Sequence, residues 1–128
     1  MLKGIQVSRE EFLKAKPIRN PGLDWNEEEK SVRVTVPGKK TFLRNILTRL
    51  LPLTREKRIV LDEQGSFIWN LCDGKTSIKT IAESLNAKYD MPISHAEAAL
   101  DVYFVQLSKR GLVGFVLPES ARKRYVRR

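Results

Sequence analysis

The residues able to carry catalysis or to hold a metal are few in this chain. His95 is the only histidine and Cys72 the only cysteine. A zinc site needs several Cys or His ligands, and a Ser-His-Asp mechanism would depend on His95 alone. We interpret His95, in the first turn of an expected helix, as a solvated side chain. Cys72 falls on an apolar helical stripe, and we interpret it as a small buried hydrophobe.

Carboxylates and glycines do not suggest a catalytic site either. Helix capping and turns explain Asp62, Glu63 and Asp73. Gly65 and Gly74 lack the flanking Lys-Ser/Thr of a phosphate-binding loop. We therefore assign no catalytic residue, no metal site and no cofactor, and we predict that the protein is not an enzyme.

Size and composition favour a small globular domain. The chain has 128 residues, of which 41% are hydrophobic, so it can bury a modest core. One cysteine allows no internal disulfide and fits a reducing compartment. Residues 1–12 carry charges where a signal peptide would be apolar, and no apolar run approaches the roughly 20 residues that span a bilayer. We expect a soluble, cytoplasmic protein.

The chain is strongly basic. Its formal net charge is +9 and its isoelectric point is near 9.9. Such a balance attracts nucleic acid, anionic membrane or an acidic protein, without choosing among them. Basic residues gather in the stretch 39–58 and in the last residues, 122–128. We interpret the second group as a solubilising tail.

The N-terminal half predicts a short helix followed by strands. Ser8 and Glu11 have the spacing of a capping box, so we expect a helix that ends before Pro17, and then a loop over residues 19–22. Further strand and helix signals follow in order. They are a short apolar piece at 23–25, a polar turn at 26–30, an alternating strand at 31–36, an amphipathic basic helix at 39–51 and a β-branched strand at 58–61.

Three helices and a final strand are predicted in the C-terminal half. Asp62, Ser77 and Ser94 are the expected N-caps, with Ser94 and Glu97 in a second capping box. Gly74 ends the first helix, Met91 and Pro92 break the second, and Gly111 ends the third. A short strand is expected within residues 112–117.

This element order predicts an α+β fold, with a small antiparallel sheet followed by a three-helix bundle, as in winged helix-turn-helix domains. We expect four segments. They are an N-terminal arm or short helix (1–20), a winged-helix domain (21–118), a basic amphipathic insert within it (39–56) and a flexible basic tail (119–128).

Residues 58–113 resemble the PqqD family, the pyrroloquinoline quinone biosynthesis protein D family. The resemblance is carried by Val60-Leu61-Asp62-Glu63, Gly65, Phe67-Ile68-Trp69, Leu71-Cys72-Asp73-Gly74, Ser77-Ile78, Ile81-Ala82, Leu85, Tyr89, Leu107 and Arg110-Gly111-Leu112-Val113. It implies an adaptor that binds the leader of a ribosomally made precursor peptide and presents it to a modifying enzyme, often a radical-SAM enzyme. The basic insert and the tail make this chain longer than a minimal family member. The pathway therefore stays open between quinone synthesis and another peptide modification.

A peptide-binding edge is the site that we expect. An exposed edge strand offers unpaired main-chain groups, to which an extended peptide can add as another strand. We expect the strand at 58–61 to receive the peptide and the third C-terminal helix to wall the groove. The predicted binding residues are Arg58, Ile59, Val60 and Leu61 on the strand, and Ala99, Tyr103, Gln106 and Arg110 on the helix. For Tyr103 a core position, and for the two arginines a solvated one, remain equally open.

Two other functions fit parts of the pattern. A winged helix-turn-helix with this charge can bind nucleic acid, although Glu97 and Asp101 on the third helix would face phosphates badly. The leucine-rich basic segment 42–51 can lie on an anionic membrane or dock into a partner enzyme. We favour packing of this segment on its own domain.

Overall fold

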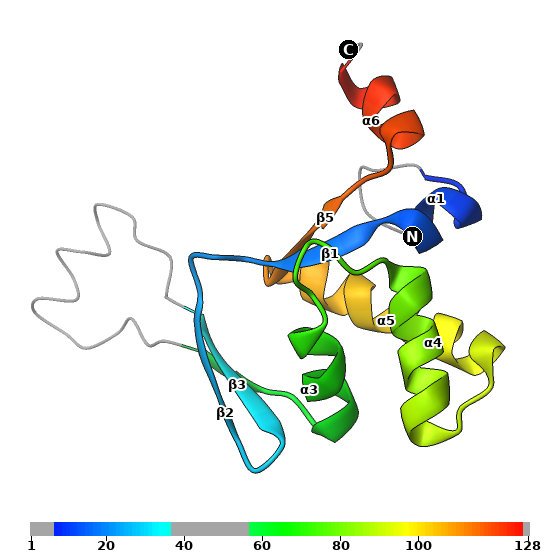
Figure 1. Ribbon diagram of the computed structural model, residues 1–128. Helices are drawn as coiled ribbons and strands as arrows, with labels where there is room; N and C mark the ends of the chain where they lie inside the picture. The colour runs from blue at the N-terminus through cyan, green and yellow to red at the C-terminus, as the bar shows by residue number, and fades with distance from the viewer. Residues whose placement is uncertain (1–6, 37–56, 127–128) are drawn as a thin grey trace, which may run out of the picture. The chain divides into compact units, whose positions relative to one another are not determined.

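The computed structural model describes residues 7–36 and 57–126, with side chains as far as Lys123. The amphipathic helix expected at 39–51, and with it the membrane-facing segment 42–51, lies outside the described residues. The elements, in chain order, are α1 (Arg9–Lys14), β1 (Lys16–Arg19), β2 (Asp24–Glu28), β3 (Ser31–Val36), β4 (Lys57–Val60), α3 (Glu63–Asn70), α4 (Ile78–Tyr89), α5 (Ile93–Lys109), β5 (Val113–Val116) and α6 (Glu119–Val126) (Figure 1).

Small antiparallel sheets and several helices make up the structure, which confirms the α+β class. The described chain divides into two compact units. One runs from Pro21 to Phe67 and holds the sheet β2-β3-β4; the other contains the described residues up to Asn20 and from Ile68 onward. None of the described helices combines the length and apolar character needed to cross a bilayer.

The β2–β3 hairpin in the first unit has a tighter turn than expected. Its two turn residues, Glu29 and Lys30, have φ values of 50° and 66°. Positive φ at both central residues is the mark of a type I′ turn, whose twist matches that of the flanking strands. The strand therefore continues to Glu28, through residues assigned to a polar turn. Every residue of β2 is exposed, so hydrophobic alternation could not reveal this strand.

The other strand and cap predictions in this unit are confirmed. β3 has the expected bounds, and its Val32 and Val34 are fully buried. β4 lies within one residue of the predicted strand at 58–61. After it, the Asp62 carboxylate accepts a hydrogen bond from the Gly65 N–H at 2.7 Å, as expected of a residue that caps α3.

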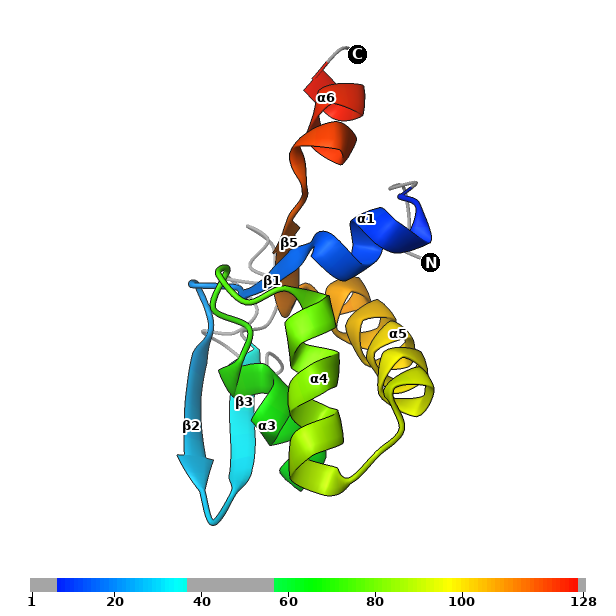
Figure 2. The same ribbon diagram turned by 45° about the vertical axis from the view of Figure 1, so that its right-hand side comes forward.

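In the second unit α4 and α5 pack side by side, and α1 lies against α4 (Figure 2). The largest fully buried side chains here include Phe12, Trp69, Ile78, Ile81, Leu85, Leu100, Phe104 and Leu112. Burying each of them stabilises the fold by about 1.5–3 kcal/mol. Cys72 is also fully buried, as predicted, and His95 is exposed, as predicted.

Local signals placed three helix ends correctly. The Ser8–Glu11 capping box is present at the start of α1. Ser77 accepts a hydrogen bond from the Thr80 N–H, and Gly111 adopts a φ of 72° just past α5. Left-handed backbone of this kind favours glycine because it has no Cβ.

The Ser94 cap is wrong. α5 begins at Ile93, with Pro92 at its N-cap and no side-chain capping bond. The Pro92 carbonyl already accepts a hydrogen bond from the Ala96 N–H at 2.9 Å. Proline's fixed φ suits the start of a helix, so the helix starts before Ser94 can cap it.

β1 was missed because a proline lies inside it. Pro17 faces Phe115 in the antiparallel pair β1–β5, within a segment assigned to a helix end and a loop. The final strand β5, expected within residues 112–117, is confirmed. Proline has no N–H to donate to a strand ladder, so its presence argues against a strand. The strand β1 is recognised only from its pairing with β5, which lies far away in the sequence.

The tail also differs in secondary structure. A helix, α6, covers Glu119–Val126, where only a flexible basic tail was expected. Glu119 pairs with Lys123 one turn later at 3.5 Å, and Ala121 is fully buried. Ser120 donates a hydrogen bond at 2.8 Å to Glu11, the capping-box residue of α1. These contacts join α6 to the N-terminal helix, which composition alone could not indicate.

Candidate functional site

The strand predicted to receive a peptide lies at the edge of its sheet. The strand order is β2-β3-β4, and within the described residues β4 pairs with β3 alone. Lys57 and Arg58 are exposed, Ile59 is half-buried, and Val60 retains 62% of its surface. An edge of this kind presents unpaired main-chain groups on its outer side.

The hydrogen-bond pattern identifies which residues present those groups. The Leu61 N–H donates to the Val32 carbonyl at 2.8 Å, so Leu61 is bonded toward β3. Main-chain groups of successive residues in an antiparallel strand point to opposite sides. Ile59 therefore also bonds toward β3, whereas Arg58 and Val60 direct their N–H and C=O groups away from the sheet.

A buried serine fixes the end of this strand. The Ser66 hydroxyl, 1% exposed, accepts a hydrogen bond from the Val32 N–H at 2.7 Å and donates to the Leu61 carbonyl at 3.3 Å. The Ser31 hydroxyl donates to the same carbonyl at 2.8 Å. Both main-chain groups of Leu61 are thus engaged inside the unit. No sequence pattern indicated this role for Ser66.

Side chains of Arg58 and Val60 share the outer face of the sheet. Their cross-strand neighbours are Thr35 and Arg33, on the face opposite the buried Val34. A hollow of about 320 Å³ on the sheet is lined by Asp24, Trp25, Asn26, Glu28, Arg33, Thr35 and Arg58. Within it Arg33 pairs with Glu28 at 3.3 Å. Sequence reasoning missed this hollow because it depends on the register of three strands.

The predicted residues on α5 lie along one side of the helix. Ala99, Gln106 and Arg110 are exposed and Tyr103 is half-buried, with its ring edge-on to Phe104 at 5.2 Å. Three of the predicted residues, Arg58, Ile59 and Val60, lie on β4, and Leu61 follows it directly. Three others, Ala99, Tyr103 and Gln106, lie on α5, and Arg110 is its C-cap. The two elements belong to different units.

Val102 was overlooked on α5. It is 63% exposed and lies three residues after Ala99 and four before Gln106, which is the spacing of neighbours on a helix surface. It adds an apolar group to the exposed side that carries the predicted residues. The signal was available in the sequence, because Val102 does not fit the buried stripe of Leu100 and Phe104.

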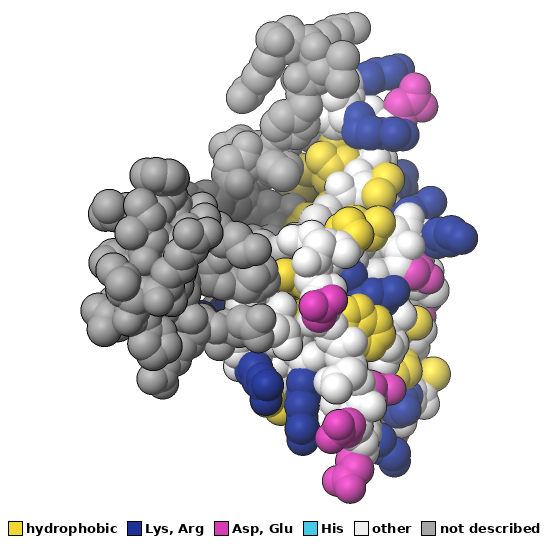
Figure 3. All heavy atoms as spheres, turned by 90° about the vertical axis from the view of Figure 1, so that its left-hand side faces the viewer, with side chains coloured by type: hydrophobic (Ala, Val, Ile, Leu, Met, Phe, Trp, Pro, Cys, Tyr) yellow, Lys and Arg dark blue, Asp and Glu magenta, His cyan; other side chains and the backbone are white. Residues whose placement is uncertain are grey.

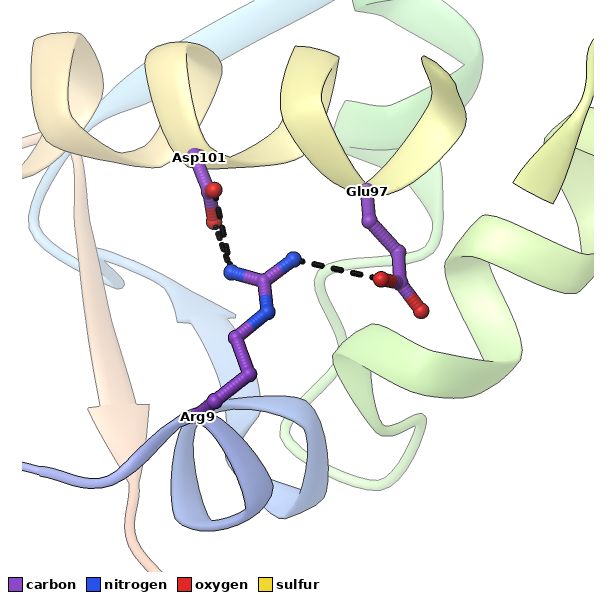
Figure 4. Close-up of polar contacts among 3 residues, drawn as sticks. All are labelled: Arg9, Glu97 and Asp101. Atoms are coloured by element: carbon purple, nitrogen blue, oxygen red, sulfur yellow. Dashed lines mark hydrogen bonds and ion pairs between the residues drawn. The ribbon is translucent and has the colours of Figure 1, made fainter. Parts of the chain in front are cut away.

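An arginine from α1 holds the other flank of α5. Arg9 Nη1 contacts both carboxylate oxygens of Asp101, at 2.7 and 2.9 Å, and Nη2 contacts Glu97 at 3.3 Å (Figure 4). The hydrogen bond to Asp101 is the main cause that raises the pKa of Arg9. At about 100° per residue, Glu97 and Asp101 lie across the buried stripe from Ala99 and Arg110. This clamp therefore anchors α5 without covering its predicted binding face.

The nucleic-acid alternative gains no support from these contacts. Glu97 and Asp101 remain on α5 and are already engaged by Arg9. On the described part of the face in Figure 3, Lys and Arg side chains are interspersed with Asp and Glu. A phosphate-binding surface is instead usually a patch or stripe of one sign.

Neither the Cys72 thiol nor the described acidic side chains form a reactive or metal-binding centre. Burial raises the pKa of the Cys72 thiol to about 12, and its Sγ donates to the Ile68 carbonyl at 3.2 Å. Such a thiol is protonated at neutral pH and is a poor nucleophile. Across residues 7–36 and 57–126, no cluster of three or more His, Cys, Asp or Glu side chains is arranged to hold a metal ion.

Comparison with curated proteins and with solved structures gave no match. Comparison with protein families gave one, to the model described as coenzyme PQQ synthesis protein D (PqqD), over residues 48–113. The matched region includes β4, α3, α4 and α5 and ends at the first residue of β5. It begins before Arg58, inside the segment 39–56 that was interpreted as an insert. Since the match covers half of the sequence, the chain belongs to the PqqD family.

Proposed function

We propose that this protein is a non-catalytic adaptor that captures the leader of a ribosomally made precursor peptide as an added strand beside β4. The observation that best supports this proposal is the outward direction of the main-chain groups of Arg58 and Val60 on an exposed edge strand. Membership of the PqqD family supports the same role, because the family resemblance implies leader binding.

Main-chain pairing would supply the sequence-independent part of the affinity. Arg58 and Val60 together offer two N–H donors and two carbonyl acceptors. Each hydrogen bond contributes a net stabilisation of about 0.5–1.5 kcal/mol. Four such bonds are enough for a weak complex only, so side-chain contacts must add the rest.

Those contacts are proposed to come from α5. Its exposed side combines the apolar Ala99 and Val102, the ring of Tyr103, the amide of Gln106 and the charge of Arg110. These groups can contact apolar and polar side chains of a leader, and Arg110 can meet an acidic residue. The clamp from Arg9 to Glu97 and Asp101 keeps α5 in place from its other flank.

The partner enzyme is proposed to be a radical-SAM enzyme that modifies the captured peptide, as the family resemblance implies. Pyrroloquinoline quinone synthesis is the pathway that the family's description suggests. The described residues of the adaptor need not take part in the chemistry. Their role is to hold the leader, which raises the effective concentration of the peptide at the enzyme.

The proposal is tested by titrating the full-length protein with candidate leader peptides while following backbone amide shifts. We expect the largest shifts at Arg58 and Val60, whose N–H groups point outward. The other edge of the same sheet, β2, is the internal control. Shifts confined to β2, or absent from β4 at saturating peptide, would contradict the proposal.

A further inference from the structure

We infer that the β4 edge selects an acidic residue and an aliphatic residue two positions apart in the captured segment. This inference rests on the proposed function and names the sequence class that the edge would accept. It comes from the register of the sheet and from the different surroundings of Arg58 and Val60.

The register decides which side chains meet. In an antiparallel addition, the peptide residues opposite Arg58 and Val60 would exchange main-chain bonds with them, with Cα atoms about 5.5 Å apart. Side chains of directly opposed residues lie on the same face. The two contacting peptide residues are then separated by one residue that points to the other face. A parallel peptide keeps this spacing and reverses the order.

Arg58 supplies the electrostatic preference. Its cross-strand neighbour is the neutral Thr35, and no ion pair joins it to any carboxylate in the described part of the chain. Arg33, on the next strand of the same face, is already paired with Glu28 at 3.3 Å. A carboxylate on the peptide would therefore complete a cross-strand ion pair with Arg58, whereas a lysine would be repelled.

Val60 supplies the apolar preference. Its side chain is 62% exposed and has Arg33 as its cross-strand neighbour on β3. On its other side, no strand of the described residues pairs with β4. An isoleucine, valine or leucine opposite Val60 would remove both side chains from water, and a charged residue there would gain no partner.

The experiment is a selection from a displayed library of random 12-residue segments on the immobilised full-length protein. We expect wild type to enrich Asp or Glu two positions from an aliphatic residue. Arg58→Glu should enrich Lys or Arg at the same position and keep the aliphatic residue. Val60→Lys should lose the aliphatic preference and keep the acidic one.

The matched control keeps the sheet's charges but moves them. In the double variant Glu28→Arg with Arg33→Glu, the ion pair between β2 and β3 is retained with its sign reversed, and β4 is unchanged. Its selected sequences should be those of wild type. In solution, replacing the acidic residue of a selected peptide with Lys should weaken wild-type binding by about threefold to fivefold. The same replacement should strengthen binding to Arg58→Glu.

The outcomes separate this inference from the proposed function. Peptides that shift the β4 amides but show the same charge preference on wild type and Arg58→Glu would overturn the selection rule and leave the adaptor role standing. An equal change of preference in the Glu28/Arg33 control would do the same. No enrichment on wild type, or selected peptides that leave β4 unperturbed, would overturn both.

Discussion

The two edges of one sheet, β2 and β4, differ in what they offer to another strand. β2 is exposed along its whole length and carries Asp24, Glu27 and Glu28. β4 carries Lys57 and Arg58 followed by Ile59 and Val60. Charged residues on an edge discourage pairing with other chains, and a row of acids would repel an acidic segment most strongly. On the proposed function, an acidic leader would therefore be repelled less by β4 than by β2.

The strand β1 has a covered edge. The outer side of β1 is covered by the segment around Asp73. Arg19 N–H donates to the Cys72 carbonyl at 3.1 Å, and Gly74 N–H donates to the Pro17 carbonyl at 2.8 Å. Within the described residues, by contrast, β4 pairs with β3 alone.

The largest effect is expected where β4 is fixed to β3. Ser66→Ala would remove the acceptor of the buried Val32 N–H and leave that group unsatisfied. We expect the free energy of unfolding to fall by about 1–3 kcal/mol. Urea denaturation monitored by circular dichroism would measure it. Thr80→Ala, at an exposed position on α4, is the matched control and should cost less; an equal loss would contradict the assigned role of Ser66.

Proline substitution compares the two edges directly. Val60→Pro removes an outward N–H and leaves the bonds from Ile59 and Leu61 to β3 in place. We expect peptide affinity to fall about tenfold, the equivalent of one good hydrogen bond. Glu27→Pro makes the same change on β2, because Glu27 alternates with the bonded pair Glu28–Ser31 beside the turn. Calorimetric titration showing equal losses in both variants would remove the distinction between the edges.

Charge reversal at Arg110 tests whether α5 contributes to peptide binding. Arg110→Glu should weaken the binding of an acidic leader by roughly threefold, since an exposed ion pair contributes less than about 1 kcal/mol. Lys79→Glu, an exposed reversal on α4, gives the same change in net charge and should have no such effect. If the two variants bind equally well in fluorescence anisotropy, α5 has no part in the contact.

The smallest effect concerns the turn that covers β1. Hydrogen bonds from the Lys75 and Thr76 N–H groups, the first of them the largest cause, hold the pKa of Asp73 below its usual range. A lowered folded-state pKa stabilises the fold above the unfolded value, about 3.9, and this contribution is lost as pH falls through the folded value. The difference in melting temperature between wild type and Asp73→Ala should therefore shrink below about pH 4. A difference that stays constant down to pH 2.5 would show that the carboxylate charge is not responsible.

The sequence predicted part of the candidate site. The β-branched run at 58–61 and the exposed spacing of Ala99, Gln106 and Arg110 both follow local periodicity, and both elements formed. The sequence could not predict which main-chain groups of β4 point outward. Their direction depends on the hydrogen bond from Leu61 to Val32 in another strand. The hollow beside Arg58 has the same origin, since three strands must align to form it.

Local signals in the sequence therefore determined the helices α1 and α4, the start of α3, the strands β3, β4 and β5, and the left-handed stop at Gly111. Each depends on side chains within a few residues of one another, whose preferences act before the chain is compact. The end of α3 was predicted at Gly74 but lies at Asn70. Only the tertiary structure decided the pairing of β1 with β5, the attachment of α6 to Glu11 and the clamp of Arg9 on α5. Those contacts join residues about 90 or more positions apart, so no local preference encodes them, and packing of the whole unit must hold them in register.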